Sequence, residues 1–454
     1  MEKIMSTFSV DFSKTSGAMK PMHAVNNGPV YKFAEDQRIT NIDAFREAGI
    51  PYARTHDASI CSSYGGEHTV DIIAVFPDFS KDPDDPASYD FALTDDYMKV
   101  MDFAGVKPFY RLGNKIEHWS KKYGTLPPPD FKKWAVICEH IIRHYTEGWA
   151  DGFKYDIEYW EIWNEPDLDP DDSTHKRTWG GTKLQFFDLF EIAAKHLKSC
   201  FPHLKIGGPA ICNPKGSWKD EFLSFCRSHN VPLDFFSWHV YAKLPSRVLE
   251  YEREVRDSLD ANGFKNTESI LNEWNYVKGW TGDNWVYSIR TMKNLKGAAF
   301  VASTIEASQY EALDMLMYYD ARPCALNGMF STDLICDNLK GYYPFRMFNQ
   351  LYKCGTAASV SSDDPTVYGA AAVGNGKAAA MFTYYEDLDE AENKPIKLEL
   401  SSLPASPVKL TVRILDEKHD DEVVREEILT GKAATVYLDL ALFTTCLVMI
   451  EPID

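Results

Sequence analysis

Two glutamates stand out because each follows an asparagine at the end of a short apolar run. Glu165 lies in the run YWEIWNEP, residues 159–166, and Glu273 lies in the run ILNEWN, residues 270–275. Two carboxyl groups held about 5 to 5.5 Å apart can cleave a glycosidic bond with retention, one protonating the leaving oxygen and the other attacking the anomeric carbon. The pattern therefore predicts a pair of catalytic acids, provided that both runs end at the same edge of one sheet.

The elements that must position these glutamates alternate regularly along the chain. Extended apolar runs centre near residues 23, 53, 109, 160, 207, 237, 271 and 316, and a segment with helical spacing follows each of them. Residues 182–185 form a capping box that opens one such helix, and a single long helix is expected through residues 292–305. Eight β/α units predict a (β/α)8 barrel, in which active-site residues lie at the C-terminal ends of the strands. Glu165 would end the fourth strand and Glu273 the seventh.

The chain changes character towards its C-terminus. Apolar residues alternate with polar ones over residues 408–414, and the tripeptide GNG at 374–376 separates two runs as a hairpin turn does. This texture is typical of a β-sandwich. We therefore predict an α/β protein with a (β/α)8 catalytic barrel over residues 18–355 and a β-sandwich accessory domain over residues 356–454, joined by an N-terminal strand from residues 1–17.

Composition and charge restrict the classes of function. The 454 residues carry a formal net charge of −19, which disfavours a nucleic-acid partner because phosphate binding needs a concentrated basic surface. No run approaches the ~18 apolar residues that span a bilayer, and the first residues lack an apolar signal core, so we expect a cytoplasmic protein with no membrane partner. The nine cysteines are scattered without a Cys-x-x-Cys pair, which predicts reduced thiols and disfavours disulfides or a thiolate zinc site.

Three motifs together resemble a known group of enzymes. They are WEIWNEP at residues 160–166, DFFSWHVY at 234–241 and NEWN at 272–275. They resemble the retaining clan A glycoside hydrolases and look most like glycoside hydrolase family 39, which includes β-xylosidases and α-L-iduronidases. The resemblance covers the barrel, and it implies that Glu165 is the general acid/base and Glu273 the nucleophile.

The same resemblance assigns substrate-binding roles to residues around the two glutamates. Arg54 would support the charge of the nucleophile, and Asn164 would hydrogen-bond the 2-hydroxyl group of the sugar. A lone histidine or tryptophan is more often a core residue, yet positions at strand ends favour function here. The remaining candidates are His56 in an Arg-x-His pattern, His239 and Tyr241 on the same floor, and Trp274 beside the nucleophile.

The two acids need different protonation states, and their expected surroundings provide a physical basis for that difference. Burial beside a second carboxylate raises the pKa of an acid, whereas a neighbouring guanidinium lowers it. We therefore expect Glu165 to hold a proton near neutral pH and Arg54 to keep Glu273 ionised. Asp57 and Arg111 depart from the family pattern near the terminal sugar, so another pentose, a hexose or a uronic acid stays open beside xylose.

These observations predict a retaining, exo-acting glycoside hydrolase that cleaves small glycosides or oligosaccharides in the manner of a β-xylosidase. We expect it to need no metal or other cofactor and to bind a carbohydrate substrate, and a homo-oligomer stays open. Alternatives are another clan A activity, such as an arabinofuranosidase or an endo-glycanase, and a non-catalytic glycan-binding barrel. The presence of both Glu165 and Glu273 disfavours the last of these.

Overall fold

Eight parallel strands form a closed barrel in the computed structural model, which describes residues 5–34, 37–57, 68–332 and 336–453. Around the barrel the strands follow the order β10-β11-β2-β5-β6-β7-β8-β9. They coincide with the eight apolar runs in the sequence, which confirms the predicted barrel. Their bounds are β2 (Ala24–Asn26), β5 (Tyr52–Arg54), β6 (Lys107–Leu112), β7 (Tyr159–Ile162), β8 (Lys205–Ile211), β9 (Phe235–Ala242), β10 (Glu268–Tyr276) and β11 (Met315–Tyr318).

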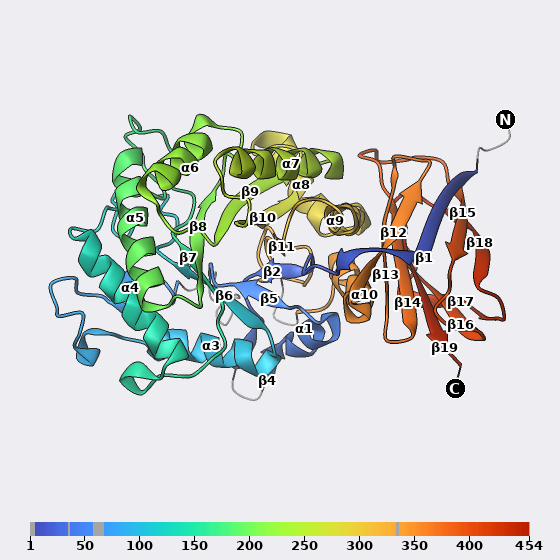
Figure 1. Ribbon diagram of the computed structural model, residues 1–454, viewed down its shortest axis with the longest axis horizontal. Coiled ribbons are helices and arrows are strands. Elements are labelled where there is room, and N and C mark those ends of the chain that lie inside the picture. The colour runs from blue at the N-terminus through green and yellow to red at the C-terminus, as the bar shows by residue number, and fades with distance from the viewer. Residues whose placement is uncertain (1–4, 35–36, 58–67, 333–335, 454) are drawn as a thin grey trace.

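Helices between these strands cover the outside of the barrel (Figure 1). Local sequence determines where several of them begin. Asp130 accepts hydrogen bonds from the backbone N–H groups of Lys132 and Lys133 at the start of α4. Thr182 and Gln185 form the predicted capping box of α5. The helices are α1 (Ile42–Ala48), α2 (Ile72–Val75), α3 (Ala92–Ala104), α4 (Phe131–Thr146), α5 (Lys183–Cys200), α6 (Ser217–His229), α7 (Pro245–Ala261), α8 (Gly282–Met292), α9 (Leu295–Ser308) and α10 (Tyr343–Cys354).

The prediction of a single helix through residues 292–305 is wrong, because the structure has two helices there, α8 and α9. Between them Asn294 has an extended backbone, and its side chain accepts hydrogen bonds from the N–H groups of Lys296 and Gly297. The asparagine therefore caps a new helix. Apolar periodicity alone does not reveal this break, since it continues on both sides of the cap.

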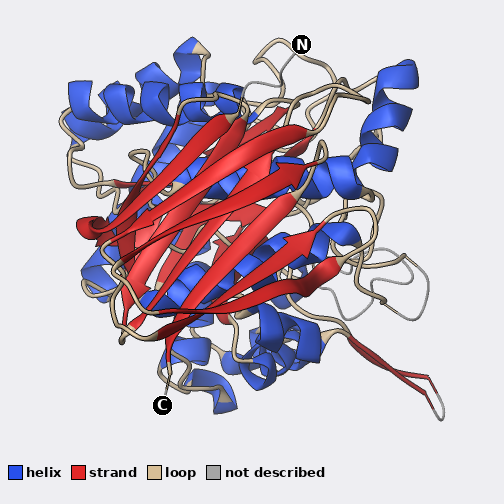
Figure 2. Ribbon diagram, turned by 90° about the vertical axis from the view of Figure 1, so that its right-hand side faces the viewer, coloured by secondary structure: helices blue, strands red, loops and turns tan. Residues whose placement is uncertain are grey.

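Nine strands of the described chain form a separate sheet beside the barrel (Figures 1 and 2). Its order is β17-β16-β19-β14-β13-β12-β1-β15-β18, and β1 pairs antiparallel with β12 and parallel with β15. The rings of Phe8 on β1 and Phe382 on β14 stack 5.1 Å apart although two strands separate them in the sheet. The sheet therefore curls over its own core, as a sandwich does. The strands are β1 (Ser6–Ala18), β12 (Thr356–Ser362), β13 (Val367–Gly374), β14 (Lys377–Tyr384), β15 (Lys394–Ser401), β16 (Val408–Leu415), β17 (Asp420–Leu429), β18 (Ala433–Leu440) and β19 (Thr445–Pro452).

Helices α9 and α10 lie between the barrel and this sheet (Figure 1). Thr383 of β14 donates a hydrogen bond of 2.9 Å to the buried carboxyl of Glu306 on α9, and burial raises the pKa of Glu306 well above its usual value. Tyr310, just after α9, donates a hydrogen bond of 2.7 Å to the carbonyl of Ala358 on β12. The sheet is thus attached to the barrel by buried polar contacts as well as by apolar packing.

Two smaller features complete the architecture. Strands β3 (Tyr31–Ala34) and β4 (Gln37–Thr40) form an antiparallel hairpin that the sequence pattern did not predict. The eight cysteines within the described residues form no disulfide, and Cys61 lies outside those residues. Across the same part of the chain, no helix combines the length and apolar character that crossing a bilayer requires.

Candidate active site

Glu165 reaches the mouth of the barrel through a sharp turn directly after β7. Trp163 (φ 75°) and Glu165 (φ 48°) both have left-handed backbone conformations, which cost about 1–3 kcal/mol each for residues other than glycine. The Glu165 N–H donates to the carbonyl of Ala210 at 2.9 Å, and the Thr178 hydroxyl donates to the Glu165 carbonyl at 2.5 Å. These contacts hold the turn in place and so determine where the Glu165 side chain begins.

Glu273 lies on β10 at an irregularity in its pairing with β9. Leu271 is opposite Trp238 and Glu273 is opposite His239, so Asn272 has no partner in the ladder at this point. A bulge of this kind re-aims the side chains that follow it, and such bulges are common next to active sites. The Glu273 side chain is buried inside the barrel mouth, with the residue 6% exposed.

Arg54 at the end of β5 connects the two glutamate-bearing strands. Its guanidinium donates to Glu273 Oε1 at 2.8 Å, to Glu161 Oε2 at 2.6 Å and to Asn164 Oδ1 at 2.6 Å. Asn164 therefore uses its carbonyl oxygen toward Arg54, which turns its amide N–H groups the other way. Because Arg54 is fully buried, its charge acts on Glu273 with little screening by water.

Glu161 is the second counter-charge of Arg54, and sequence reasoning missed it. The other oxygen of its carboxylate accepts hydrogen bonds from the Ser237 hydroxyl at 2.6 Å and the Asn272 amide at 2.5 Å. Two carboxylates thus flank one guanidinium, and three barrel strands contribute to the network around Glu161. The available signal was a charged residue within an otherwise aromatic and aliphatic strand, since a fully buried glutamate is rare without a partner.

His239 and Tyr241, both on β9, contact the two glutamates. His239 Nδ1 lies 2.8 Å from Glu165 Oε1 and 3.5 Å from Glu273 Oε2, and the Tyr241 hydroxyl donates to Glu273 Oε2 at 3.0 Å. Carboxylate oxygens of both glutamates and a ring nitrogen of His239 lie within 4.8 Å of one another. The structure therefore brings together residues that are far apart in the sequence.

Burial changes the proton affinity of these groups. It raises the pKa of Glu165 to about 7, against the opposing positive charges of Arg54 and Arg177. It also raises the pKa of Glu273, while His239, Arg54 and the Tyr241 hydroxyl oppose that rise. Burial lowers the pKa of His239 to about 4, so its ring is neutral near pH 7. The site therefore holds two acids of different hydrogen-bond environment beside a neutral imidazole.

Comparison with known protein families agrees with this geometry, because the model of the glycosyl hydrolases family 39 matches residues 12–314. The chain belongs to this family. The resemblance seen in its motifs is therefore confirmed.

Individual relatives of this family 39 hydrolase are more distant. A β-xylosidase of Geobacillus stearothermophilus is 30% identical over 199 residues, which cover 40% of this chain and 36% of that protein. A β-xylosidase of Caldicellulosiruptor saccharolyticus is 29% identical over 164 residues, 34% of this chain and 31% of that protein. The match thus spans about a third of the length of these curated relatives.

Two solved structures have the same fold over nearly the whole chain. A glucosidase from Croceicoccus marinus aligns with a TM-score of 0.80 at 24% identity, covering 99% of this chain and 100% of that one. A monomeric β-xylosidase from Caulobacter crescentus CB15 aligns with a TM-score of 0.71 at 17% identity, with coverage of 99% and 100%. Both identities are low, so these likenesses support the fold of the family 39 hydrolase and not its substrate.

Two of the predicted site residues have aromatic rings as neighbours. His56 is buried beside the ring of Tyr319, with centroids 6.0 Å apart, and burial lowers its pKa well below the usual value. The structure does correct the prediction for Trp274, because this residue is fully buried and packs against Tyr318 of β11 and Phe300 of α9. Side chains alternate along a strand, so the residue after Glu273 faces the helix layer and has no surface for a sugar.

The two departures from the family pattern are both buried and both paired. Arg111 forms an ion pair of 2.7 Å with Asp71 and donates to the carbonyl of His56 at 3.0 Å. Asp57 lies 2.8 Å from His68 and 2.9 Å from Arg322. Although burial acts to raise it, the pKa of Asp57 is held well below its usual range by these contacts. Arg111 thus contacts the chain just after β5 through the carbonyl of His56.

Arg322 was not singled out from the sequence, and it lies in the loop after β11. Its guanidinium contacts Asp57 at 2.9 Å and Asp320 at 3.2 Å, and Asn27 donates to Asp320 at 2.7 Å. Two carboxylates therefore already flank this guanidinium. Described residues from the loops after β2, β5 and β11 thus meet in a charged cluster.

Trp280 provides an aromatic surface at the rim, on the loop after β10. Its ring is edge-on to Tyr241, with centroids 4.9 Å apart, and stacks on Trp285 at 5.3 Å. The residue is nevertheless 55% exposed. Tyr241 donates directly to Glu273, so the exposed indole of Trp280 contacts a residue that itself contacts the acid pair.

Two groups within the described residues place metal-ligating atoms of three side chains within 4.8 Å of one another. The first is the cluster of Glu165, His239 and Glu273. There Glu273 already accepts hydrogen bonds from Arg54 and Tyr241, so its charge and lone pairs are matched by protein donors. This arrangement suits an acid pair better than a metal centre. The second group lies on the outer helices α4 and α5.

Proposed function

We propose that this family 39 hydrolase is a retaining, exo-acting enzyme that cleaves small glycosides or oligosaccharides by double displacement. The observation that carries the proposal is that carboxylate oxygens of Glu165 and Glu273 lie within 4.8 Å of each other. Of these two glutamates, Glu273 is the one that contacts the positively charged Arg54 directly. Retaining enzymes hold their carboxyl groups about 5 to 5.5 Å apart, whereas inverting enzymes leave about 6.5 to 9.5 Å for a water molecule.

In the first step, Glu165 protonates the glycosidic oxygen while a Glu273 oxygen attacks the anomeric carbon. The bond to the leaving group breaks, an alcohol departs and a glycosyl ester forms on Glu273. In the second step, ionised Glu165 takes a proton from water, which attacks the anomeric carbon and releases Glu273 as the carboxylate. In the free enzyme the proton is on Glu165, because protonation of Glu273 would weaken the hydrogen bonds that Glu273 accepts from Arg54 and Tyr241.

The surrounding residues have distinct roles in this scheme. Arg54 and Tyr241 hold the nucleophile ionised and fix its orientation. Asn164, whose carbonyl oxygen is occupied by Arg54, presents its amide donor to the 2-hydroxyl group of the sugar. Neutral His239 separates the two acids and orients Glu165. We also propose that residues 18–355 form the catalytic domain and that residues 356–454, with the strand from residues 1–17, form an accessory domain.

The substrate we propose is a β-xyloside or a closely related glycoside, since two curated relatives carry the name β-xylosidase. An arabinofuranosidase or an endo-glycanase is the alternative within the clan. A panel of nitrophenyl glycosides ranks the sugars, and end-labelled oligosaccharides distinguish release of single terminal sugars from internal cleavage. Sugar binding without hydrolysis of any glycoside would support a non-catalytic barrel instead.

Covalent trapping tests the assignment of the nucleophile. A 2-fluoro glycoside of the preferred sugar should inactivate the enzyme and label Glu273, as located by peptide mass spectrometry. Proton NMR of the first-formed sugar should show the same anomer as the substrate. A label on another residue would remove Glu273 from its role, and an inverted product would exclude the double displacement.

We predict that kcat/KM falls as pH rises through about 7, because the pKa of Glu165 is raised to that value and only its protonated form donates to the leaving oxygen. On the acid side, kcat/KM should fall when Glu273 gains a proton. Measuring kcat/KM from about pH 4 to 9 would test both limbs. A flat profile through neutral pH would contradict the assignment of Glu165 as the acid.

We predict that Trp280→Ala raises KM for an oligosaccharide about three- to tenfold with a smaller change in kcat, which is the scale of one aromatic contact. The exposed indole would stack on the part of the substrate outside the terminal sugar. Trp280→Phe should recover most of the loss. Tyr437→Ala, which removes another exposed ring on β18, is the matched control. Unchanged KM in Trp280→Ala would exclude this contact.

A further inference from the structure

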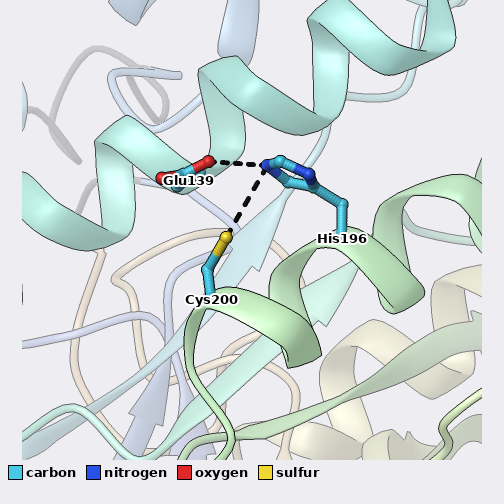
Figure 3. Close-up of side chains that lie close together, drawn as sticks. All are labelled: Glu139, His196 and Cys200. Carbon is cyan, nitrogen blue, oxygen red and sulfur yellow. Dashed lines mark hydrogen bonds and ion pairs between the residues drawn. The ribbon is translucent and has the colours of Figure 1, made fainter.

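A group of potential metal ligands lies between α4 and α5 on the outer layer of the barrel. Figure 3 shows Glu139 on α4 directed toward His196 and Cys200 on α5. His196 Nε2 is 2.6 Å from Glu139 Oε2 and 3.9 Å from Cys200 Sγ. His196 and Cys200 are four residues apart in one helix, so their side chains lie on the same face.

The arrangement converges on one point. The three ligand atoms, an oxygen, a nitrogen and a sulfur, lie within 4.8 Å of one another. His196 Nε2 faces both Glu139 Oε2 and Cys200 Sγ. The imidazole N–H proton and the thiol proton therefore both lie in the space between these three atoms. A divalent cation in that space would take the place of both protons.

Arg143 orients the Glu139 carboxylate toward the position of the cation. It donates to Glu139 Oε1 at 2.8 Å, while Oε2 is the oxygen that faces His196. The guanidinium therefore orients the carboxylate through the oxygen that a metal would not need. Hydrogen bonds of this kind behind a ligand commonly fix its direction in metal sites.

We propose that Glu139, His196 and Cys200 bind Zn²⁺, with water as the fourth ligand. Zn²⁺ accepts oxygen, nitrogen and sulfur ligands in a tetrahedral arrangement at about 2.0 to 2.3 Å, so the three side chains need only small movements to close around it. The imidazole binds through Nε2 as the neutral ring with its proton on Nδ1, and the thiol loses its proton to solvent when the Zn–S bond forms. The charges of one carboxylate and one thiolate then balance those of the ion.

The site does not depend on the hydrolytic mechanism proposed above. Its three ligands come from two outer helices, and each residue is partly exposed, which provides a path for the ion. Bound Zn²⁺ would connect α4 to α5 and stabilise the folded state by binding it and not the unfolded chain. The expected effect is on stability, with little change in kcat.

The test uses the 454-residue chain after treatment with EDTA and dialysis. Titration with Co²⁺ should produce a thiolate-to-cobalt charge-transfer band at one equivalent, and Zn²⁺ should remove it. Zn²⁺ should also raise the midpoint of thermal unfolding by about 2 °C or more. Cys200→Ser should lose the band, and His196→Ala should weaken Co²⁺ binding at least about tenfold.

Two controls match the site. His229 forms an ion pair of 2.7 Å with Glu191, so His229→Ala removes an imidazole paired with a glutamate elsewhere on the outer helices and should leave the band unchanged. Cys354→Ser removes another partly exposed thiol and should do the same. For a readout that needs no variant, Zn²⁺ should slow carboxymethylation of Cys200, measured by mass spectrometry. Absence of the band in the unsubstituted protein, its persistence in Cys200→Ser, or alkylation of Cys200 unaffected by Zn²⁺ would overturn the proposal.

Discussion

Replacing Glu273 with glutamine is expected to lower kcat by about 10⁴-fold or more, the scale on which hydrolases lose activity when a covalent nucleophile is removed. The amide cannot form a stable glycosyl ester, and the buried guanidinium of Arg54 then keeps its contact with the Glu161 carboxylate but loses the one with Glu273. Steady-state kinetics on the best nitrophenyl glycoside would measure the loss. The 2-fluoro glycoside should no longer label the protein.

A matched control separates catalysis from damage to the strand. Glu268 lies on the same strand, β10, and its carboxylate pairs with Lys205 and not with the acid pair. Glu268→Gln should keep kcat within a few-fold of the starting value. In Glu273→Gly, added azide should attack the anomeric carbon from the vacated face and give a glycosyl azide of inverted configuration. Substantial hydrolysis by Glu273→Gln would rule out this residue as the nucleophile.

Replacing Glu165 with glutamine is expected to lower kcat/KM about 10²- to 10⁴-fold on a natural glycoside, because the leaving alcohol then departs without a proton. An activated aryl glycoside needs little protonation, so its first step should be affected far less. Its second step should still be slow, since Glu165 also activates the water. The decline of kcat/KM near pH 7 should disappear in this variant, because that decline reports the raised pKa of Glu165.

Asp167 provides the control for this prediction. It is a half-buried acid two residues from Glu165, with its pKa raised by desolvation to about 6, and it accepts hydrogen bonds from the N–H groups of Cys212 and Asn213. Asp167→Asn should keep the decline near pH 7 and the ratio between natural and aryl glycosides. Equal losses on both kinds of substrate in Glu165→Gln, or loss of the pH limb in Asp167→Asn, would contradict the role of Glu165.

Much of the barrel was predictable because its determinants are local. Buried parallel strands need continuous apolar runs and surface helices need a 3.6-residue period, so eight alternations are readable from the sequence. Where local chemistry interrupts the period, the prediction failed. Asn294 ends one helix and caps the next through side-chain hydrogen bonds that hydrophobic spacing does not record.

The direction of side chains was harder to predict. Trp274 follows Glu273 in sequence, but strand alternation and the irregular pairing of β10 turn it into the helix layer. Trp280, six residues later, lies instead at the rim beside Tyr241. Closeness in sequence to Glu273 is therefore a poor guide to closeness in space, because successive residues on a strand face opposite sides.

By itself the sequence determined the fold class and the family and singled out the two glutamates that we propose as the acid pair, since each depends on contiguous motifs and on the rule that strands present chemistry at their C-terminal ends. Only the tertiary structure decided the distance between the acids, the contact of Arg54 with Glu161 and Glu273, and the charged cluster of Asp57, Arg322 and Asp320. It also brought Glu139 of one helix to His196 and Cys200 of another, a ligand set without a sequence motif. The physical reason is the same in each case: proton affinity, ion pairing and metal ligation depend on separation and burial, which residues far apart in the chain acquire only when it folds.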